Sequence, residues 1–362
     1  MGSLKERVEI VDALRGFALF GMLIANLGVF THNEIDFLEM ASTIYSQFIL
    51  NNFYPMFAIL FGLSFYMFMS RPRNTKLIFV RRLVILLILG IMHMVFVWHL
   101  DILHAYAITG IFLLFFYKMD LSSLKKWLVV LFILDMLFAA FLSDLLSGLV
   151  TTSAPSIISS YNASSYGANL SITIENVPGI LYDAVVDIPH HLFLFLIGLY
   201  LGKSGVFMET RDRLESVVRV SWWSMGLFVL FYFSRMIVRN YGLADEYLSL
   251  PLSNLFNLSL TFFYITLFVV FYHWKKDNYI FDRFRLIGKM TLTSYLTHSV
   301  IYLLLFYEIN LGLYNELPTM LTPLLAVVIY LAQSEFARIW LNKFGHGPVE
   351  KVWRFFTYVG TD

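Results

Sequence analysis

Apolar residues recur along the whole chain in runs of about 20, each bounded by a short polar or charged segment. A run of this length is long enough to cross the hydrocarbon core of a bilayer as a helix. The pattern therefore predicts an all-α, polytopic membrane protein with about ten transmembrane helices. The predicted spans are residues 13–31, 48–69, 83–99, 102–118, 124–146, 180–202, 219–240, 250–273, 290–307 and 318–340.

One long polar segment separates the first five predicted spans from the last five. Residues 147–178 contain no Lys or Arg, are rich in Ser, Asn and Tyr, and are expected to end at Pro178 and Gly179. Connections of this length are often functional or disordered. We expect a single membrane domain over residues 1–362, divided into five spans (1–146), an outer loop (147–178), five spans (179–340) and a cytoplasmic tail (341–362).

Basic residues are concentrated in alternate loops. In the predicted topology 24 of the 26 Lys and Arg residues fall on one side, and only Arg235 and Arg239 fall on the other. Cytoplasmic loops carry the excess of basic residues in membrane proteins. Both termini are therefore predicted to be cytoplasmic.

Composition narrows the class of function. The chain is 59% hydrophobic and 14% charged, which leaves too little polar surface for a water-soluble globule, so the lipid bilayer is an expected partner. Its net charge of +1 gives no indication of a nucleic-acid partner. It has no Cys, which excludes disulfides and thiolate metal sites, and no Walker or dinucleotide glycine motif. Composition leaves the oligomeric state open.

The first predicted span carries two polar residues, Arg15 and Asn26. They are eleven residues apart, so they share one helical face and lie roughly 16 Å apart along the axis. Polar groups on a membrane helix are costly without partners or water, so this face is a candidate substrate site. The alternatives are that Arg15 pairs with Asp12 and extends to the interface, and that Asn26 only binds a neighbouring helix.

A second polar group lies between the third and fourth predicted spans. His93, His99, Asp101 and His104 occur within twelve residues of an otherwise apolar segment. They could form an interfacial turn in which Asp101 caps the following helix, or one wall of a substrate cavity. A metal site is disfavoured, because His99, Asp101 and His104 lack ligand spacing on one helical face.

The sixth predicted span opens with Asp187, Pro189, His190 and His191. Asp187 and His191 are one helical turn apart, so the carboxylate could orient the imidazole and raise its basicity. A buried network that only packs helices is the alternative. His298, in the ninth span, is expected to be an interhelical hydrogen-bond donor or part of the substrate site. We expect the histidines of the outer half to converge in one polar chamber.

Several motifs, taken in order, resemble the YeiB-like family of bacterial membrane proteins, a domain of unknown function. They are Asp12-Ala-Leu-Arg-Gly with Asn26, Leu60-Phe-Gly-Leu-Ser, Gly90-Ile-Met-His with Trp98 and Asp101, Gly288-Lys-Met-Thr-Leu-Thr-Ser-Tyr, and Phe344-Gly-His-Gly-Pro-Val-Glu-Lys-Val-Trp-Arg. The resemblance covers nearly the whole chain and implies a multi-pass protein of the bacterial plasma membrane.

The Arg-Gly pair with a polar residue eleven positions after the Arg is also similar to two sets of membrane acyltransferases. That polar residue is an Asn in the lysosomal heparan-α-glucosaminide N-acetyltransferase type, as Asn26 is here, and a His in bacterial enzymes that acylate surface sugars. This resemblance implies a ten-helix acyltransferase fold, with acyl-CoA or a similar donor in the cytoplasm and a sugar or glycolipid acceptor on the far side. In the N-acetyltransferase type an active-site His follows the Asn by about eleven residues, whereas His32 follows Asn26 by six.

The resemblance implies a role for each candidate residue. Arg15 would bind the donor phosphates, Asn26 would bind the acyl carbonyl, and His32 or His191, the latter oriented by Asp187, would be the general base. The remaining candidate binding residues are His93, His99, Asp101, His104, His190 and His298. No metal is expected. A transporter, or a lipid- or small-molecule-binding membrane protein without covalent chemistry, is the alternative, because intramembrane His and Asp also serve proton coupling.

The topology can be tested with one introduced cysteine, because the chain has none of its own. A Ser160→Cys variant should react with a membrane-impermeant thiol reagent added outside intact cells, since the charge asymmetry puts residues 147–178 outside. Labelling from the cytoplasmic side alone would contradict the predicted orientation.

Overall fold

The computed structural model describes residues 2–30, 46–50, 52–142, 166–206, 214–241, 246–275, 277–307, 310–314, 316–318 and 321–360. Helices make up most of these ranges. They are α1 (Gly2–Leu27), α3 (Phe53–Met69), α4 (Lys76–Phe96), α5 (Leu103–Gly110), α6 (Leu113–Phe116), α7 (Leu121–Leu137), α10 (Tyr166–Val186), α11 (Ile188–Ser204), α12 (Leu214–Asn240), α13 (Glu246–Lys275), α14 (Tyr279–Lys289), α15 (Thr291–Phe306), α16 (Thr322–Phe344) and α17 (Pro348–Tyr358). Short 3₁₀ or π turns extend three of them, at Gly28–Phe30, Ser46–Leu50 and Phe138–Leu142.

Six helices in the described ranges are long and apolar enough to cross a membrane, or seven if α10 and α11 together form one bent span. The six are the segments Glu9–Phe30, Gln47–Met69, Lys76–Phe96, Leu214–Asn240, Leu248–Lys275 and Thr322–Phe344. An all-helical, multi-pass architecture is therefore confirmed. The number ten and the orientation of the termini stay predictions.

Two regions depart from the expected boundaries. Helix α10 begins at Tyr166, so the second part of the expected outer loop is helical and Pro178 lies inside a helix instead of ending a loop. The chain then bends by 51° between α10 and α11, at Asp187, because Pro189 in the first turn of α11 cannot continue the hydrogen-bond ladder of α10. The expected fourth span, 102–118, consists of two short helices, α5 and α6.

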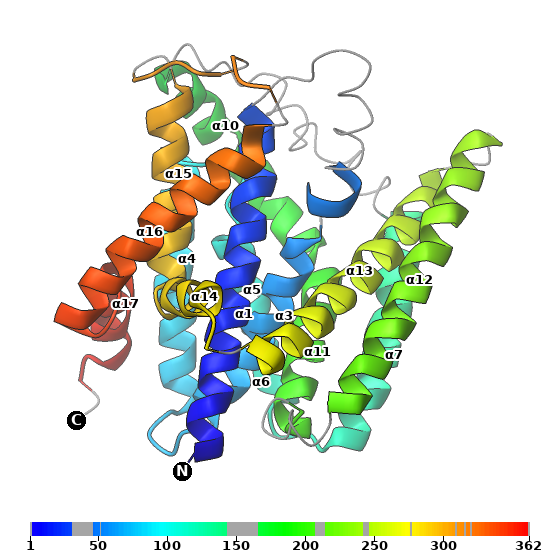
Figure 1. Ribbon diagram of the computed structural model, residues 1–362. Helices are drawn as coiled ribbons and strands as arrows, with labels where there is room; N and C mark the ends of the chain where they lie inside the picture. Colours follow the sequence, from blue (N-terminus) through cyan, green and yellow to red (C-terminus); the bar gives the residue numbers. More distant parts are fainter. Residues whose placement is uncertain are drawn as a thin grey trace.

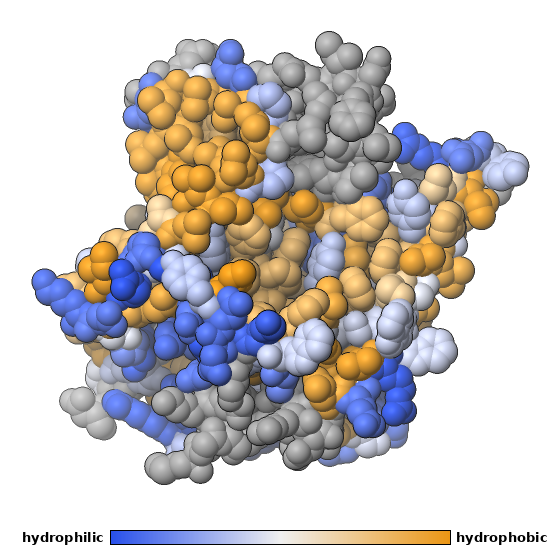
Figure 2. All heavy atoms as spheres, viewed as in Figure 1, coloured by the Kyte–Doolittle hydropathy of each residue, from blue (hydrophilic) through white to orange (hydrophobic). Residues whose placement is uncertain are grey.

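Helix α1 runs through the middle of the bundle (Figure 1) and packs against α3, α14, α15 and α16. Helix α11 packs against α3, α5 and α7, and α12 packs along α13 at one edge. Both chain termini lie toward the same end of the molecule in Figure 1. Figure 2 shows hydrophilic residues gathered toward that end on this face, with a broad apolar surface over the other half. We call this end the N-terminal end of the bundle.

Two glycines bring α1 and α14 into backbone contact. A Cβ atom added to Gly16 would overlap the carbonyl of Phe284, and one added to Gly288 would overlap the carbonyl of Asp12. Gly16 thus meets the residue four positions before Gly288, and Gly288 meets the residue four positions before Gly16. Small residues allow this close approach, which supplies packing energy where the surrounding lipid offers no hydrophobic driving force.

Helices α3 and α11 cross in the same reciprocal way. A Cβ atom on Gly62 would overlap the carbonyl of Phe195, and one on Gly198 would overlap the carbonyl of Ile59. This crossing fixes the beginning of α11, which carries His190 and His191, against the beginning of α3.

Replacing Gly198 by Ala should separate α3 from α11 and destabilise the fold by about 1–3 kcal/mol, because the added methyl group has no space. Gly226 in α12 is a matched control, since nothing lies within 4 Å of its added Cβ atom. Gly226→Ala should leave the thermal unfolding midpoint in detergent unchanged or raised, because Ala is the better helix former. Equal midpoints for the two variants would refute the close-crossing interpretation.

Candidate functional site

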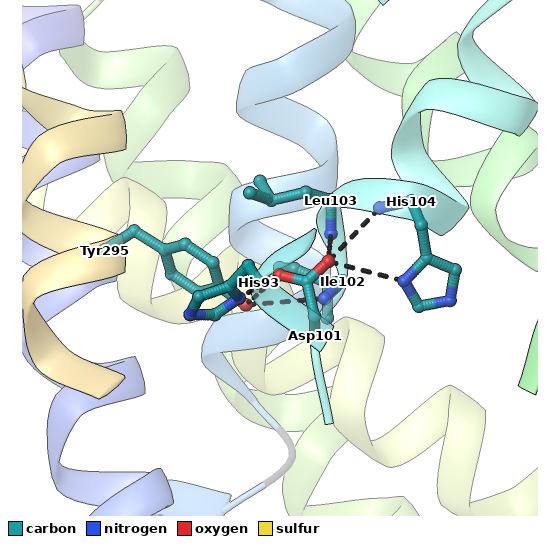
Figure 3. Close-up of polar contacts among 6 residues, drawn as sticks. All are labelled: His93, Asp101, Ile102, Leu103, His104 and Tyr295. Atoms are coloured by element: carbon teal, nitrogen blue, oxygen red, sulfur yellow. Dashed lines mark hydrogen bonds and ion pairs between the residues drawn. The ribbon is translucent and has the colours of Figure 1, made fainter. Parts of the chain in front are cut away.

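A buried carboxylate, Asp101, is the centre of one hydrogen-bonded cluster (Figure 3). Its Oδ1 atom lies 2.8 Å from Nδ1 of His93 on α4 and 3.2 Å from the hydroxyl of Tyr295 on α15. Its Oδ2 atom accepts from the backbone N–H of Leu103 at 2.8 Å and lies 3.3 Å from both the backbone nitrogen and Nδ1 of His104. Asp101 therefore joins three helices and satisfies amide groups at the start of α5.

The cluster keeps Asp101 ionised. Burial alone would raise the pKa of Asp101, but hydrogen bonds from His104 and His93 outweigh burial and lower it below its ordinary value. An ionised carboxylate only accepts hydrogen bonds, so Nδ1 of His93 is the donor in this pair and Nε2 is the nitrogen directed away from it. That Nε2 atom is buried and has no hydrogen-bond partner in the described part of the chain.

His99 lies in the turn between α4 and α5, beside Trp98, with 5.1 Å between the ring centres. Burial lowers the pKa of His99 to about 4, so the ring is uncharged at neutral pH. The turn therefore combines the capping role expected for Asp101 with two buried rings. Over the described ranges, no group of three or more acidic or His residues is placed to hold a metal ion.

A cavity of about 440 Å³, here called the basic cavity, opens at the N-terminal end of the bundle. Its lining includes five cationic side chains from separate segments and only two carboxylates, Asp12 and Glu350. The cations are Arg15, Arg71, Arg82, Lys289 and Arg354. Aromatic and aliphatic side chains line the rest, and along α3 the lining extends from Phe57 to Phe68, roughly 16 Å. The cavity thus combines a cationic mouth with a long apolar interior.

Arg15 lies in the lining of this cavity. One guanidinium nitrogen is 2.7 Å from Oδ1 of Asp12 and another is 2.7 Å from Oγ of Ser64 on α3. Arg15 is therefore held across the interface between α1 and α3, and its pairing with Asp12 is only part of its environment. Asn26, at the other end of the same stripe, is half-buried and does not line either cavity described here.

Helix α17 forms one side of the basic cavity and contacts α15 and α4. The Glu350 carboxylate accepts from the backbone N–H groups of Leu292 and Thr293, at 2.7 and 3.0 Å, and so caps α15. The indole of Trp353 donates to the carbonyl of Arg82 at 3.0 Å, and the Arg82 guanidinium lies 3.5 Å from the centre of that ring. Arg82 forms no salt bridge with a carboxylate of the described chain, so its charge is available to an anion in the cavity.

A second cavity, of about 410 Å³ and here called the polar cavity, lies in the half of the bundle away from the N-terminal end. His190 and Asp135 line it, and Nδ1 of His190 lies 3.0 and 3.2 Å from the two carboxylate oxygens. Asp135 comes from the apolar second half of helix α7 and was not among the predicted residues. Asn254, Asn257 and Ser253 of α13 face the same cavity.

His191 lies between the two cavities. Its ring makes edge contacts with Tyr54, which lines the polar cavity, and Tyr106, which lines the basic cavity, with ring centres 5.4 and 5.7 Å apart. Its Nδ1 atom is 2.9 Å from the backbone carbonyl of Asp187. A carbonyl only accepts, so Nδ1 carries the proton and Nε2 holds the lone pair. That Nε2 atom is buried and unpartnered within the described residues.

The contacts of the sixth predicted span differ from those expected. Asp187 orients His191 through its backbone carbonyl and not through its carboxylate, because the residue lies at the break between α10 and α11. The neighbouring His190 takes Asp135 as its carboxylate partner. No hydrogen bond in the described chain joins this pair to the Asp101 cluster, so the polar groups form two clusters instead of one chamber.

The remaining candidates have simpler positions. Nε2 of His298 lies 2.8 Å from the amide oxygen of Gln333 on α16, which fits the interhelical donor expected for a lone intramembrane His. His32 lies outside the described residues. Tyr295, which the sequence indicated only as part of a motif, connects the basic cavity to the Asp101 cluster.

Comparison with known proteins gives the family context. Residues 201–360 match the family model described as a protein of unknown function, DUF418. The chain is 28% identical to the uncharacterized protein YxaH of Bacillus subtilis, in an alignment that covers 98% of the chain and 95% of YxaH. It is also 27% identical, with 98% and 95% coverage, to an uncharacterized 39.9 kDa protein of Bacillus acidopullulyticus encoded in an amylase 3' region. It is 26% identical, with 97% and 96% coverage, to the uncharacterized protein YeiB of Escherichia coli.

Replacing Asp101 by Asn should lower the thermal unfolding midpoint, because His93 and His104 lose a charged acceptor and the amide cannot accept at both oxygen positions. A loss of about 2–3 kcal/mol is expected for hydrogen bonds to a buried charge. Asp282→Asn is the control, since that carboxylate is 53% exposed in its pair with Arg285 and should matter little. Similar midpoints for both variants would mean that Asp101 is not a structural centre.

Proposed function

We propose that the chain is a YeiB-like member of the DUF418 family and a multi-pass acyltransferase of the bacterial plasma membrane. It would move an acyl group from a cytoplasmic thioester donor, acyl-CoA or a similar molecule, to an acceptor hydroxyl or amine at the outer face, where a sugar or glycolipid is the acceptor suggested by the resemblance. The observation that carries the proposal is His191: its ring contacts a wall residue of each cavity, Tyr54 and Tyr106, and its Nε2 atom has no hydrogen-bond partner among the described residues.

The donor would bind in the basic cavity. Guanidinium groups bind phosphate oxygens bidentately, and Arg15, Arg71 and Arg82 all line the mouth. The apolar interior along α3 would hold the acyl arm of the donor, with the thioester toward Tyr106 and Tyr295 at the inner end. This arrangement needs the N-terminal end of the bundle to face the cytoplasm, as the distribution of Lys and Arg predicts.

The reaction would be a direct transfer with His191 as the general base. The acceptor oxygen or nitrogen attacks the thioester carbonyl carbon and passes its proton to Nε2 of His191. A new bond forms between the acceptor atom and the acyl carbon, the carbon–sulfur bond breaks, and the leaving thiolate takes the proton back from His191. The backbone carbonyl of Asp187 keeps the proton on Nδ1, so Nε2 is the nitrogen that accepts the acceptor's proton.

His93 and Asp101 are assigned a supporting role. Their pair has the form of a His–carboxylate dyad, but both residues contact Tyr295, which belongs to the wall of the basic cavity and not to that of the polar cavity. In this proposal the Asp101 cluster holds the Tyr295 hydroxyl at the inner end of the cavity.

Replacing Arg82 by Gln should weaken binding of acetyl-CoA to the purified protein by roughly 10- to 100-fold, since one charged hydrogen bond to a phosphate is worth about 1.5–3 kcal/mol. Arg338→Gln is the matched control, because that side chain is 58% exposed, pairs with Glu335 and lies outside the basic cavity. His191→Gln should retain donor binding and lose acyl transfer. Full transfer by His191→Gln would remove His191 as the base.

A transfer assay in vesicles distinguishes an acyltransferase from a transporter. Vesicles containing the protein are loaded with acetyl-CoA labelled in the acetyl group, and extracts of the outer cell surface are added outside. An acyltransferase gives label covalently attached to an outer acceptor. Label appearing outside as the unmodified donor, with no acylated product, would instead support transport through the two cavities.

A further inference from the structure

The polar cavity is walled by four helices, α3, α7, α11 and α13, and holds two amide side chains that face it from α13. The lining residues of α13 form one stripe on that helix, because they are spaced by four, three and one positions: Leu250, Asn254, Asn257 and Leu258. Neither Asn254 nor Asn257 hydrogen-bonds to another residue in the described ranges. Both amides are half-buried beside apolar side chains, where a polar group without a partner is costly. A hydrogen-bonding occupant of the cavity would satisfy them.

The charges of the lining define the kind of occupant. Asp135 and His190 are the ionisable acid and base of the wall, and they are paired with each other. No Lys or Arg is among the residues that line the cavity. The basic cavity, with five cations, has the opposite character. An anion would therefore meet the Asp135 carboxylate with no Lys or Arg beside it, whereas a neutral ligand could donate hydroxyl protons to that carboxylate and exchange hydrogen bonds with both amides.

The remaining wall is apolar and partly aromatic. Its lining also includes Tyr54, Pro55, Met136 and Phe193. A site with apolar walls and a few convergent polar groups suits a compact ligand that has both C–H faces and hydroxyl groups. The volume, about 410 Å³, is in the range of small-molecule pockets.

We infer that the polar cavity binds an uncharged ligand carrying several hydroxyl groups, through Asp135, Asn254 and Asn257, and discriminates against anions. The further step, that this ligand is the acceptor of acyl transfer, rests on the proposed function. Tyr54 lines the cavity and its ring contacts His191, the base of that function. One hydroxyl would then point along Tyr54 toward Nε2 of His191. His190, held by Asp135, is a positioning residue that keeps the carboxylate turned into the cavity.

The test uses a cysteine in the wall of the cavity, with binding as the readout. Ser253→Cys puts a thiol into the lining of the full-length protein, which has no other Cys. Its reaction rate with an impermeant thiol reagent is measured in vesicles with the outer face exposed. Ser171→Cys, exposed on α10 and outside the cavity, is the control for reagent access and for general effects of the probes.

Two probes with the same ring differ only in charge: methyl β-glucoside and methyl β-glucuronide. The glucoside should slow labelling at position 253 at a concentration at least tenfold lower than the glucuronide, and neither should affect position 171. Adding Asn257→Leu should raise the protective concentration of the glucoside at least tenfold. Folding of the variant is checked by its unchanged labelling at position 171 in the matching double variant.

Three results would overturn the inference: no labelling of position 253 from outside, no protection by the glucoside up to its solubility limit, or equal protection by both probes. Protection is measured without donor, so acyl transfer does not enter this readout. Protection without any acyl transfer would refute the proposed reaction and leave the binding site standing, and transfer without protection would do the reverse.

Discussion

Backbone contact between helices at four glycines is the constraint on which both cavities depend. In lipid, helices gain little from burying apolar surface against one another, so close packing must hold them. The crossing of α1 and α14 at Gly16 and Gly288 brings Arg15 and Lys289 to one cavity mouth, and the crossing of α3 and α11 brings His191 to Tyr54. The four glycines therefore fix the cationic site at one end and the imidazole in the middle of the bundle, although none of them carries a functional group.

Buried charges in this protein follow two different patterns. Asp101 is compensated on both oxygens by hydrogen bonds from three helices, as expected for a carboxylate that must stay ionised away from water. The cations of the basic cavity are less fully compensated, with five of them facing two carboxylates. Such an excess of one sign in a narrow cavity raises the local concentration of the opposite sign, which is useful only where an anion has to enter. The first pattern stabilises the fold, and the second is the electrostatic reason for placing the donor there.

The sequence predicted the helical membrane architecture, the family resemblance and Arg15, because long apolar runs and a cation within one of them are local signals. It assigned the wrong carboxylate to the histidines of the sixth span. The spacing of Asp187 and His191 holds only for a continuous helix, and the break at Asp187 turns that carboxylate away. The true partner of His190 is 55 residues away in α7, and a contact between helices of that separation leaves no periodic trace in one sequence. A lone acid in the apolar run around Asp135 was nevertheless a visible signal.

The basic cavity was not predictable as a unit, since its cations come from five segments that only the tertiary fold assembles.

The choice between His93 and His191 as the base follows from what surrounds each unpartnered nitrogen. Both rings are buried, both have Nδ1 fixed by an acceptor, and both present Nε2 without a partner in the described chain. Neither ring is part of either cavity lining, so the contacts of each ring with the cavity walls decide. His93 contacts Tyr295 of the basic cavity, whereas His191 contacts one wall residue of each cavity. The base takes a proton from the acceptor while the acceptor attacks the donor, so a position against both walls favours His191.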